Sequence, residues 1–109
     1  MQDDTVAAFR ARAERRGEVV VIVAQGELDL TGAPVLTEAV PDGDAPLVVD
    51  LASVGFMDSS GLRALLEARQ RCLDSGRPFA LARPSDAVRR VLELVDLERE
   101  FELLEAPPA

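Results

Sequence analysis

The sequence contains no histidine, no lysine and only one cysteine, and each shortage excludes a class of chemistry. Without histidine the protein lacks the commonest general base and a frequent metal ligand, and one cysteine cannot complete the usual zinc sites. Cys72 also has no second cysteine with which to form a disulfide within the chain. No lysine is present to serve a Walker-type phosphate loop. We therefore expect no catalytic residue, no metal and no cofactor.

Tryptophan and tyrosine are absent as well, and four phenylalanines are the only aromatic residues. Such a chain has little with which to stack nucleic-acid bases, and its net charge of −8 argues against nucleic acid or an anionic membrane as a direct partner. No apolar run approaches the length of a membrane span, and no apolar N-terminal segment follows a basic one. These absences predict a cytoplasmic protein.

The residues that are present suit one globular domain. The chain has 109 residues, of which 48% are hydrophobic and 29% charged, and this is enough for a single core. No repeat or linker divides it. We expect the domain to span residues 1–109, with its core at about residues 6–104 and a loose tail at residues 105–109.

Short apolar runs predict the strands. Residues 9–14 alternate between apolar and charged, and residues 19–24 are continuously apolar, so a turn at Arg16-Gly17 is expected to join them as an antiparallel hairpin. Further strands are predicted at residues 47–51, 79–82 and 101–104, with Asp50 near the end of its strand, tying down the loop at residues 52–58. Residues 25–30 are expected to form a loop.

Apolar residues at helical spacing predict three helices between these strands. The first covers residues 33–40 behind an N-cap at Thr31, the second begins at residues 58–61 and ends before Gly76, and the third follows an N-cap at Ser85. This alternation predicts an α/β fold, with a mixed sheet opened by the hairpin and packed with helices. The helical residues expected to be buried are Val35, Leu36, Ala39 and Val40; Leu62, Leu65, Leu66, Cys72 and Leu73; and Val88 (or Ala87), Val91, Leu92 and Val95.

The start of the second helix reads Asp58-Ser59-Ser60-Gly61. Aspartate and serine are preferred N-caps because their side-chain oxygens accept hydrogen bonds from the free N–H groups of the first turn. Capping alone would therefore explain these residues. A serine in a first turn can also present its hydroxyl to a partner, and a phosphate placed there would lie at the end of the helix dipole that favours anions. On physical grounds either serine could be the modified one.

Two segments together resemble the STAS domain of bacterial anti-sigma factor antagonists. Gly26-Glu27-Leu28-Asp29, followed by Thr31 and Ala33, is similar to the family's segment between a strand and a helix. Val48-Val49-Asp50-Leu51, leading to Phe56-Met57-Asp58-Ser59-Ser60-Gly61-Leu62, is similar to its phosphorylation loop. The order and spacing of the two segments also fit, and the resemblance covers about residues 6–104. The family usually carries another helix after its last strand, and the sequence ends soon after residue 104.

This resemblance implies a regulatory role for the chain rather than an enzymatic one. Family members bind an anti-sigma factor that is also a serine protein kinase; the kinase phosphorylates the second serine of the pair, here Ser60 rather than Ser59, and a serine phosphatase reverses this. The counterpart of Asp29 contributes to the kinase-binding face, and we expect Asp58, Ser59, Gly61 and Arg63 to take part in partner binding. Gly61 leaves space beside Ser60, and Arg63 is one turn away from it.

Two alternatives stay open. STAS-like domains also serve as scaffold subunits of stress-signalling assemblies and as accessory subunits of transport systems, in which Ser59 and Ser60 would act only as helix caps. In the second alternative Asp29, Asp50 and Asp58 lie together near strand ends, hold Mg²⁺ and accept a phosphoryl group, as in two-component receivers. The absence of lysine argues against that chemistry, because receivers are expected to have a lysine opposite the acid cluster.

Overall fold

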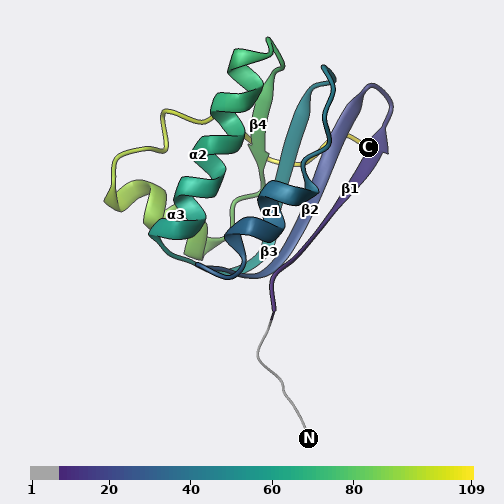
Figure 1. Ribbon diagram of the computed structural model, residues 1–109. Coiled ribbons are helices and arrows are strands. Elements are labelled where there is room, and N and C mark those ends of the chain that lie inside the picture. Colours follow the sequence, from purple (N-terminus) through teal and green to yellow (C-terminus); the bar gives the residue numbers. More distant parts are fainter. Residues whose placement is uncertain (1–7) are drawn as a thin grey trace, which may run out of the picture.

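The chain forms one five-stranded mixed sheet with three helices, as the hydrophobic pattern predicts, in a computed structural model that describes residues 8–109 (Figure 1). The predicted start of the core at residue 6 lies outside the described residues. The elements in chain order are β1 (Arg10–Arg16), β2 (Val19–Leu28), α1 (Ala33–Ala39), β3 (Leu47–Met57), α2 (Ser59–Asp74), β4 (Phe79–Ala82), α3 (Asp86–Leu94) and β5 (Leu103–Leu104).

The strands lie in the order β1-β2-β3-β4-β5, so each strand is paired with its neighbour in the sequence. β1 is antiparallel to β2, and the expected hairpin is confirmed, with its turn at Gly17 and Glu18. Gly17 has φ +62°, a conformation that glycine adopts without the strain imposed by a Cβ atom. The other neighbouring pairs are parallel, which brings the C-terminal ends of β2 and β3 to the same end of the sheet.

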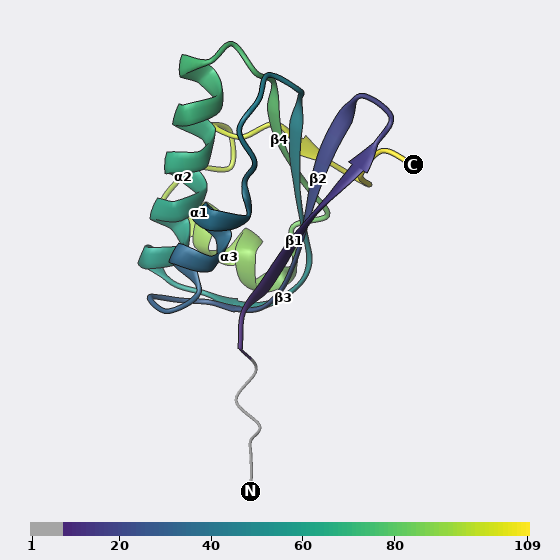
Figure 2. The ribbon, with the colours of Figure 1, turned by 45° about the vertical axis from the view of Figure 1, so that its right-hand side comes forward.

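All three helices cover one face of the sheet (Figure 2). Ile22, Val49 and Leu81 are paired across β2, β3 and β4, and all three are fully buried in the cluster beneath the helices. The helices contribute buried leucines to the same cluster, such as Leu36 from α1 and Leu65 from α2. Alternation along each strand thus places one continuous core between sheet and helices.

The opposite face of the sheet carries a second, smaller apolar cluster. Val21, Val48 and Ala80 are paired in register there and are buried. The C-terminal segment crosses this face toward β1 (Figure 2). The Pro108 carbonyl accepts a hydrogen bond from Arg16 at 3.1 Å, so the segment predicted to be a loose tail has a contact with the hairpin.

β2 and β3 are longer than predicted. The expected loops at residues 25–28 and 52–57 are strand, because Gln25 pairs with Ser53 and Leu28 with Met57. Between β2 and β3 the register shifts twice, each time by one extra residue in β3. The polar and small residues of these two segments had indicated loops, but pairing between the two strands holds both segments extended. Asp50 therefore lies in the middle of its strand rather than at the end. It is 4% exposed and accepts hydrogen bonds from the Arg83 guanidinium at 2.5 and 3.3 Å and from the Ala52 N–H at 3.2 Å.

The burial predictions fail at three helical residues. Val35, Leu73 and Val95 are exposed, although the other predicted core residues of the helices are at least partly buried. Leu73 follows the buried Cys72, and one residue further along a helix turns the side chain about 100° away from the core. The last predicted strand also shortens, to Leu103–Leu104. Within residues 8–109 no helix is both long and apolar enough to cross a membrane.

Arg77 is a buried charge that the sequence analysis did not single out. Its side chain is 6% exposed, and its guanidinium donates to the Ala45 carbonyl at 2.7 Å and to the Pro41 carbonyl at 3.2 Å. The arginine thereby ties the connection between α1 and β3 to the segment that follows α2. These carbonyls lie in a loop with no sheet partner of their own, so a charged donor satisfies them where water is largely excluded.

We predict that Arg77→Ala lowers the free energy of unfolding by about 2–3 kcal/mol, because it removes charge-assisted hydrogen bonds and buried aliphatic contacts together. Urea unfolding at neutral pH measures this difference. Arg89→Ala, which truncates an exposed arginine on α3, is the control and should change stability by less than about 0.5 kcal/mol. Equal effects of the two substitutions would show that Arg77 does not hold the loop.

Candidate functional site

The two motifs of the sequence meet where β2 and β3 end. Leu28 is paired with Met57 in parallel register, so Asp29 and Asp58 follow at the same end of the sheet. The Asp58 N–H also donates to the Leu28 carbonyl at 3.4 Å. The parallel pairing of β2 and β3 therefore brings together two segments that lie 29 residues apart in the chain.

Asp58 is the N-cap of α2, as predicted. Its Oδ1 accepts hydrogen bonds from the N–H of Ser60 at 2.9 Å and from the N–H of Gly61 at 3.2 Å. The Asp58 carbonyl accepts the first helical bond, from Leu62 at 3.0 Å. Two of the N–H groups that a helix leaves free at its start are thus already occupied by a carboxylate.

Asp29 has the corresponding role before α1, and the predicted N-cap at Thr31 is wrong. The Asp29 Oδ1 accepts from the N–H of Gly32 at 2.9 Å, and from the N–H and hydroxyl of Thr31 at 3.0 and 2.8 Å. The residue at the N-cap position is Gly32, and no side chain caps it there. The bond from Gly32, followed by those from Thr31, lowers the pKa of Asp29 below its ordinary value.

Gly61 is buried at the contact between α2 and the sheet. A Cβ atom at this position would overlap the Leu28 carbonyl oxygen and would lie 2.7 Å from the Leu28 Cγ and 2.9 Å from the Met57 Cγ. No side chain fits there without movement of the backbone. Glycine at this position lets the first turn of α2 lie directly against the last residue of β2.

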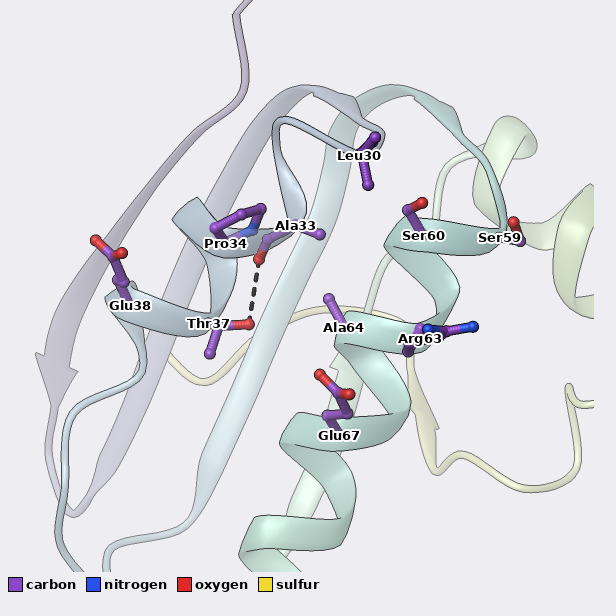
Figure 3. Close-up of a pocket in the computed structure, with 10 residues that line it drawn as sticks. All are labelled: Leu30, Ala33, Pro34, Thr37, Glu38, Ser59, Ser60, Arg63, Ala64 and Glu67. Atoms are coloured by element: carbon purple, nitrogen blue, oxygen red, sulfur yellow. Dashed lines mark hydrogen bonds between the residues drawn. The ribbon is translucent and has the colours of Figure 1, made fainter.

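The two serines face different sides of the first turn of α2. Ser60 is half-buried on the side that faces Leu30 and α1, whereas Ser59 is exposed on the far side of the turn (Figure 3). Arg63 extends away from α1 on the side of Ser59, and Ala64 and Glu67 continue the side of Ser60 (Figure 3). This follows from helical spacing, since residues four apart share a face.

A groove of about 460 Å³ runs between α1 and α2 with both serines at its rim. The sequence analysis missed most of its lining. Leu30 is 74% exposed at the groove, and Phe56 is 46% exposed near the end of β3. The available signal was a large apolar residue in each of two segments predicted to be polar loops. The groove is lined by Leu30, Ala33, Pro34, Thr37, Glu38, Ser59, Ser60, Arg63, Ala64 and Glu67.

The magnesium alternative is wrong in its geometry. Asp29 and Asp58 lie at neighbouring strand ends, but Asp50 lies inside β3 and is paired with Arg83. Among residues 8–109, no three histidine, cysteine, aspartate or glutamate residues are grouped as metal ligands would be. The two aspartates of this site instead accept hydrogen bonds from backbone N–H groups.

We predict that Gly61→Ala lowers the free energy of unfolding by about 3 kcal/mol or more, because the added methyl group displaces the backbone of α2 or β2. Gly55→Ala is the matched control, since a Cβ atom there meets no atom within 4 Å. Chemical unfolding of both variants measures the difference. A cost at Gly61 no greater than that at Gly55 would contradict the close contact.

We also predict a pH dependence from Asp29. A pKa lowered by folding stabilises the protein above the ordinary aspartate pKa, and this stabilisation is lost as the pH falls through the lowered value. Wild type should therefore exceed Asp29→Asn in unfolding free energy at neutral pH, and the difference should shrink in strong acid. Urea unfolding at several pH values tests this, and a difference independent of pH would exclude the carboxylate as its source.

Comparisons with a family model, with related sequences and with solved structures all indicate the same family. An anti-sigma-F factor antagonist of Mycobacterium tuberculosis (strain CDC 1551 / Oshkosh), RsfB, is 36% identical over 89 residues, covering 78% of this chain and 72% of the relative. The crystal structure of an anti-sigma factor antagonist from Mycobacterium paratuberculosis is 29% identical, with a TM-score of 0.80 over 91% of this chain and 87% of that one.

A more distant structure has the same fold. The Bacillus cell fate determinant SpoIIAA, in its phosphorylated form, is 23% identical, with a TM-score of 0.62 over 85% of this chain and 89% of that one. The family model described as "Mlab, STAS domain" matches residues 11–105. With the fold and nearly its whole length matched, this chain belongs to the STAS domain family.

Proposed function

We propose that the protein is a cytoplasmic anti-sigma factor antagonist, which binds an anti-sigma factor with serine kinase activity and is switched off by phosphorylation of Ser60. A serine phosphatase would restore it, and the protein would be the substrate of both enzymes rather than an enzyme. The observation that carries the proposal is the position of Ser60. Its side chain is accessible in the first turn of α2, at the rim of a groove and beside the exposed Leu30.

Leu30 gives the unmodified surface an apolar anchor. Burial of a large exposed apolar side chain by a partner contributes favourable free energy, roughly in proportion to the apolar area removed from water. Asp29 holds the loop that carries Leu30 through its bonds to Thr31 and Gly32. We therefore assign Asp29 a positioning role in partner binding, in addition to any direct contact.

The charges around Ser60 explain how a phosphate would weaken binding. The Asp58 carboxylate already accepts from the N–H groups of Ser60 and Gly61, so a phosphate on Ser60 would not gain those donors. It would instead add about −2 charge beside Asp58 and on the helix face that carries Glu67. Arg63 points away from this side (Figure 3). The new charge would therefore face the partner, where it opposes contact with an apolar or acidic surface.

The relatives support this proposal. RsfB is an antagonist of anti-sigma-F factor, and SpoIIAA is a structural neighbour known in a phosphorylated form. Ser59 would be an accessible neighbour of the modified serine, and its exposure on the opposite side of the turn makes it the natural control. Gly61 would contribute by placing the first turn of α2 against β2 rather than by touching the partner, and Ser59 and Arg63 would contact the partner only at the margin of the interface.

We predict that Ser60→Glu weakens binding to the cognate anti-sigma factor by at least about 30-fold, whereas Ser60→Ala keeps wild-type binding within about threefold. A loss of about 2 kcal/mol or more is expected from an unpaired charge at a desolvated contact. The partner is obtained by copurification from the native cells, and affinity is measured by isothermal titration calorimetry. Peptide fragmentation of the copurified protein should locate the phosphate on Ser60.

Ser59→Glu is the matched control, because it adds the same charge one residue away on the far side of the turn. Its effect on affinity should be several-fold smaller than that of Ser60→Glu. Full binding by Ser60→Glu, or a phosphate only on Ser59, would overturn the proposed switch. Copurification of a large STAS-like assembly without a kinase would favour the scaffold alternative.

A further inference from the structure

The edge strand β1 concentrates positive charge in an acidic protein. Its seven residues, RARAERR, hold four of the 12 arginines and only one of the 20 acidic residues. Arg10, Arg12 and Arg15 are exposed, and Arg16 is half-buried. β1 therefore carries a net positive charge in a chain whose net charge is −8, and the average composition does not explain this concentration of arginine.

β1 is also an open edge of the sheet. It is hydrogen-bonded to β2 alone, and within residues 8–109 no strand is paired with its other side (Figure 1). An edge strand presents backbone N–H and C=O groups that can pair with another extended segment. α1 packs over the face of the sheet near β1 and leaves this edge uncovered (Figure 2).

The charge pattern disfavours pairing between two copies of this edge. An antiparallel pairing of two β1 strands centred on Ala13 would place Arg10 of one copy opposite Arg16 of the other, and Arg12 opposite Glu14. A parallel pairing in register would place every arginine beside its counterpart. Like charges directly opposite each other destabilise a sheet, so an acidic strand suits this edge better than a second copy of β1, which brings four more arginines.

Arg10, Arg12 and Arg15 are exposed to a new partner, whereas the half-buried Arg16 also donates to the Pro108 carbonyl. Glu14 is shared between Arg12 and Arg16, at 2.7 Å from each, and these exposed or half-exposed pairs contribute little stability that a partner would have to replace. No ion pair involves Arg10 or Arg15 within the described part of the chain. Beside the strand, a hollow of about 280 Å³ is lined by Arg10, Ala11, Arg12, Val23 and Gln25.

We propose that β1 is a docking edge for an extended acidic segment of another protein, which adds a strand to the sheet and pairs its carboxylates with Arg10, Arg12 and Arg16. Side chains on one face of a strand recur every second residue, so acidic residues at alternate positions match these arginines. The acidic residue opposite Glu14 meets a carboxylate that is already paired with Arg12 and Arg16. The hollow between Arg10 and Arg12 receives one of the carboxylates. This edge is separate from the groove at Ser60, which lies between α1 and α2.

The experiment titrates the full ¹⁵N-labelled chain with the acetylated and amidated peptide Glu-Thr-Glu-Thr-Glu-Thr-Glu and follows its amide resonances. We expect the largest shifts at Arg10–Arg16, and an affinity that falls with added salt. The same peptide with glutamine in place of glutamate should bind at least about tenfold more weakly.

Strand pairing is tested by methylating the backbone nitrogens of the peptide, either those of the glutamates or those of the threonines, because only one of these two sets of N–H groups faces β1. One methylated peptide should lose binding and the other should keep it.

Arg10→Gln with Arg12→Gln should reduce the affinity for the peptide by about tenfold or more. The matched control, Arg89→Gln with Arg90→Gln, removes two exposed arginines from α3 and should change it less than about twofold. Ser60→Glu should leave peptide binding intact. A failure of the docking proposal can therefore be told apart from a failure of the proposed switch at Ser60. Equal binding of both methylated peptides, equal binding of the glutamine peptide, or a dimer that covers β1 in sedimentation would each overturn the proposal.

Discussion

The close approach of α2 to the end of β2 determines how the site is built. Gly61 allows this approach, because its missing side chain leaves room for the Leu28 carbonyl and the Met57 side chain. With the helix seated in this way, the Asp58 carboxylate reaches the first-turn N–H groups while its own N–H bonds to Leu28. Ser60 then follows directly on the capped end of the helix, next to a buried glycine, on the side of α2 that faces Leu30 (Figure 3).

The aspartates of the site illustrate why a structural and a recognition role need not compete. Asp29 and Asp58 each use one carboxylate oxygen to hold the backbone that follows, and each leaves the other oxygen free of a protein partner within residues 8–109. An acid that fixes its own loop is already ordered, so a partner that binds the free oxygen loses less conformational entropy. The structure confirms that Asp58 caps α2, and this role leaves the second carboxylate oxygen to the surface around Ser60.

Much of the fold could be predicted from the sequence, because the apolar runs and helical spacing coincide with buried positions such as Val49, Leu65 and Leu92. The cap at Asp58 follows from local chemistry, which the sequence displays directly. The extent of β2 and β3 could not be predicted, since Gln25 and Ser53 are strand residues only because they face each other. The same limit applies to Gly61 and Arg77, whose roles depend on atoms at Leu28 and Ala45 that are distant in the sequence. Leu30 was missed because exposure of an apolar residue is a property of the folded surface.

The hydrogen bonds of Asp58 also determine what kind of signal a modification of Ser60 could send. Since the N–H groups of Ser60 and Gly61 are already bound to the Asp58 carboxylate, a phosphate on Ser60 would not gain these two donors, and α2 can keep its place against the sheet. The phosphate would then act through surface charge alone, and the backbone would have the same shape before and after phosphorylation. A kinase and a phosphatase acting on this serine would meet one backbone conformation, and the reaction could be reversed many times without refolding any part of the chain.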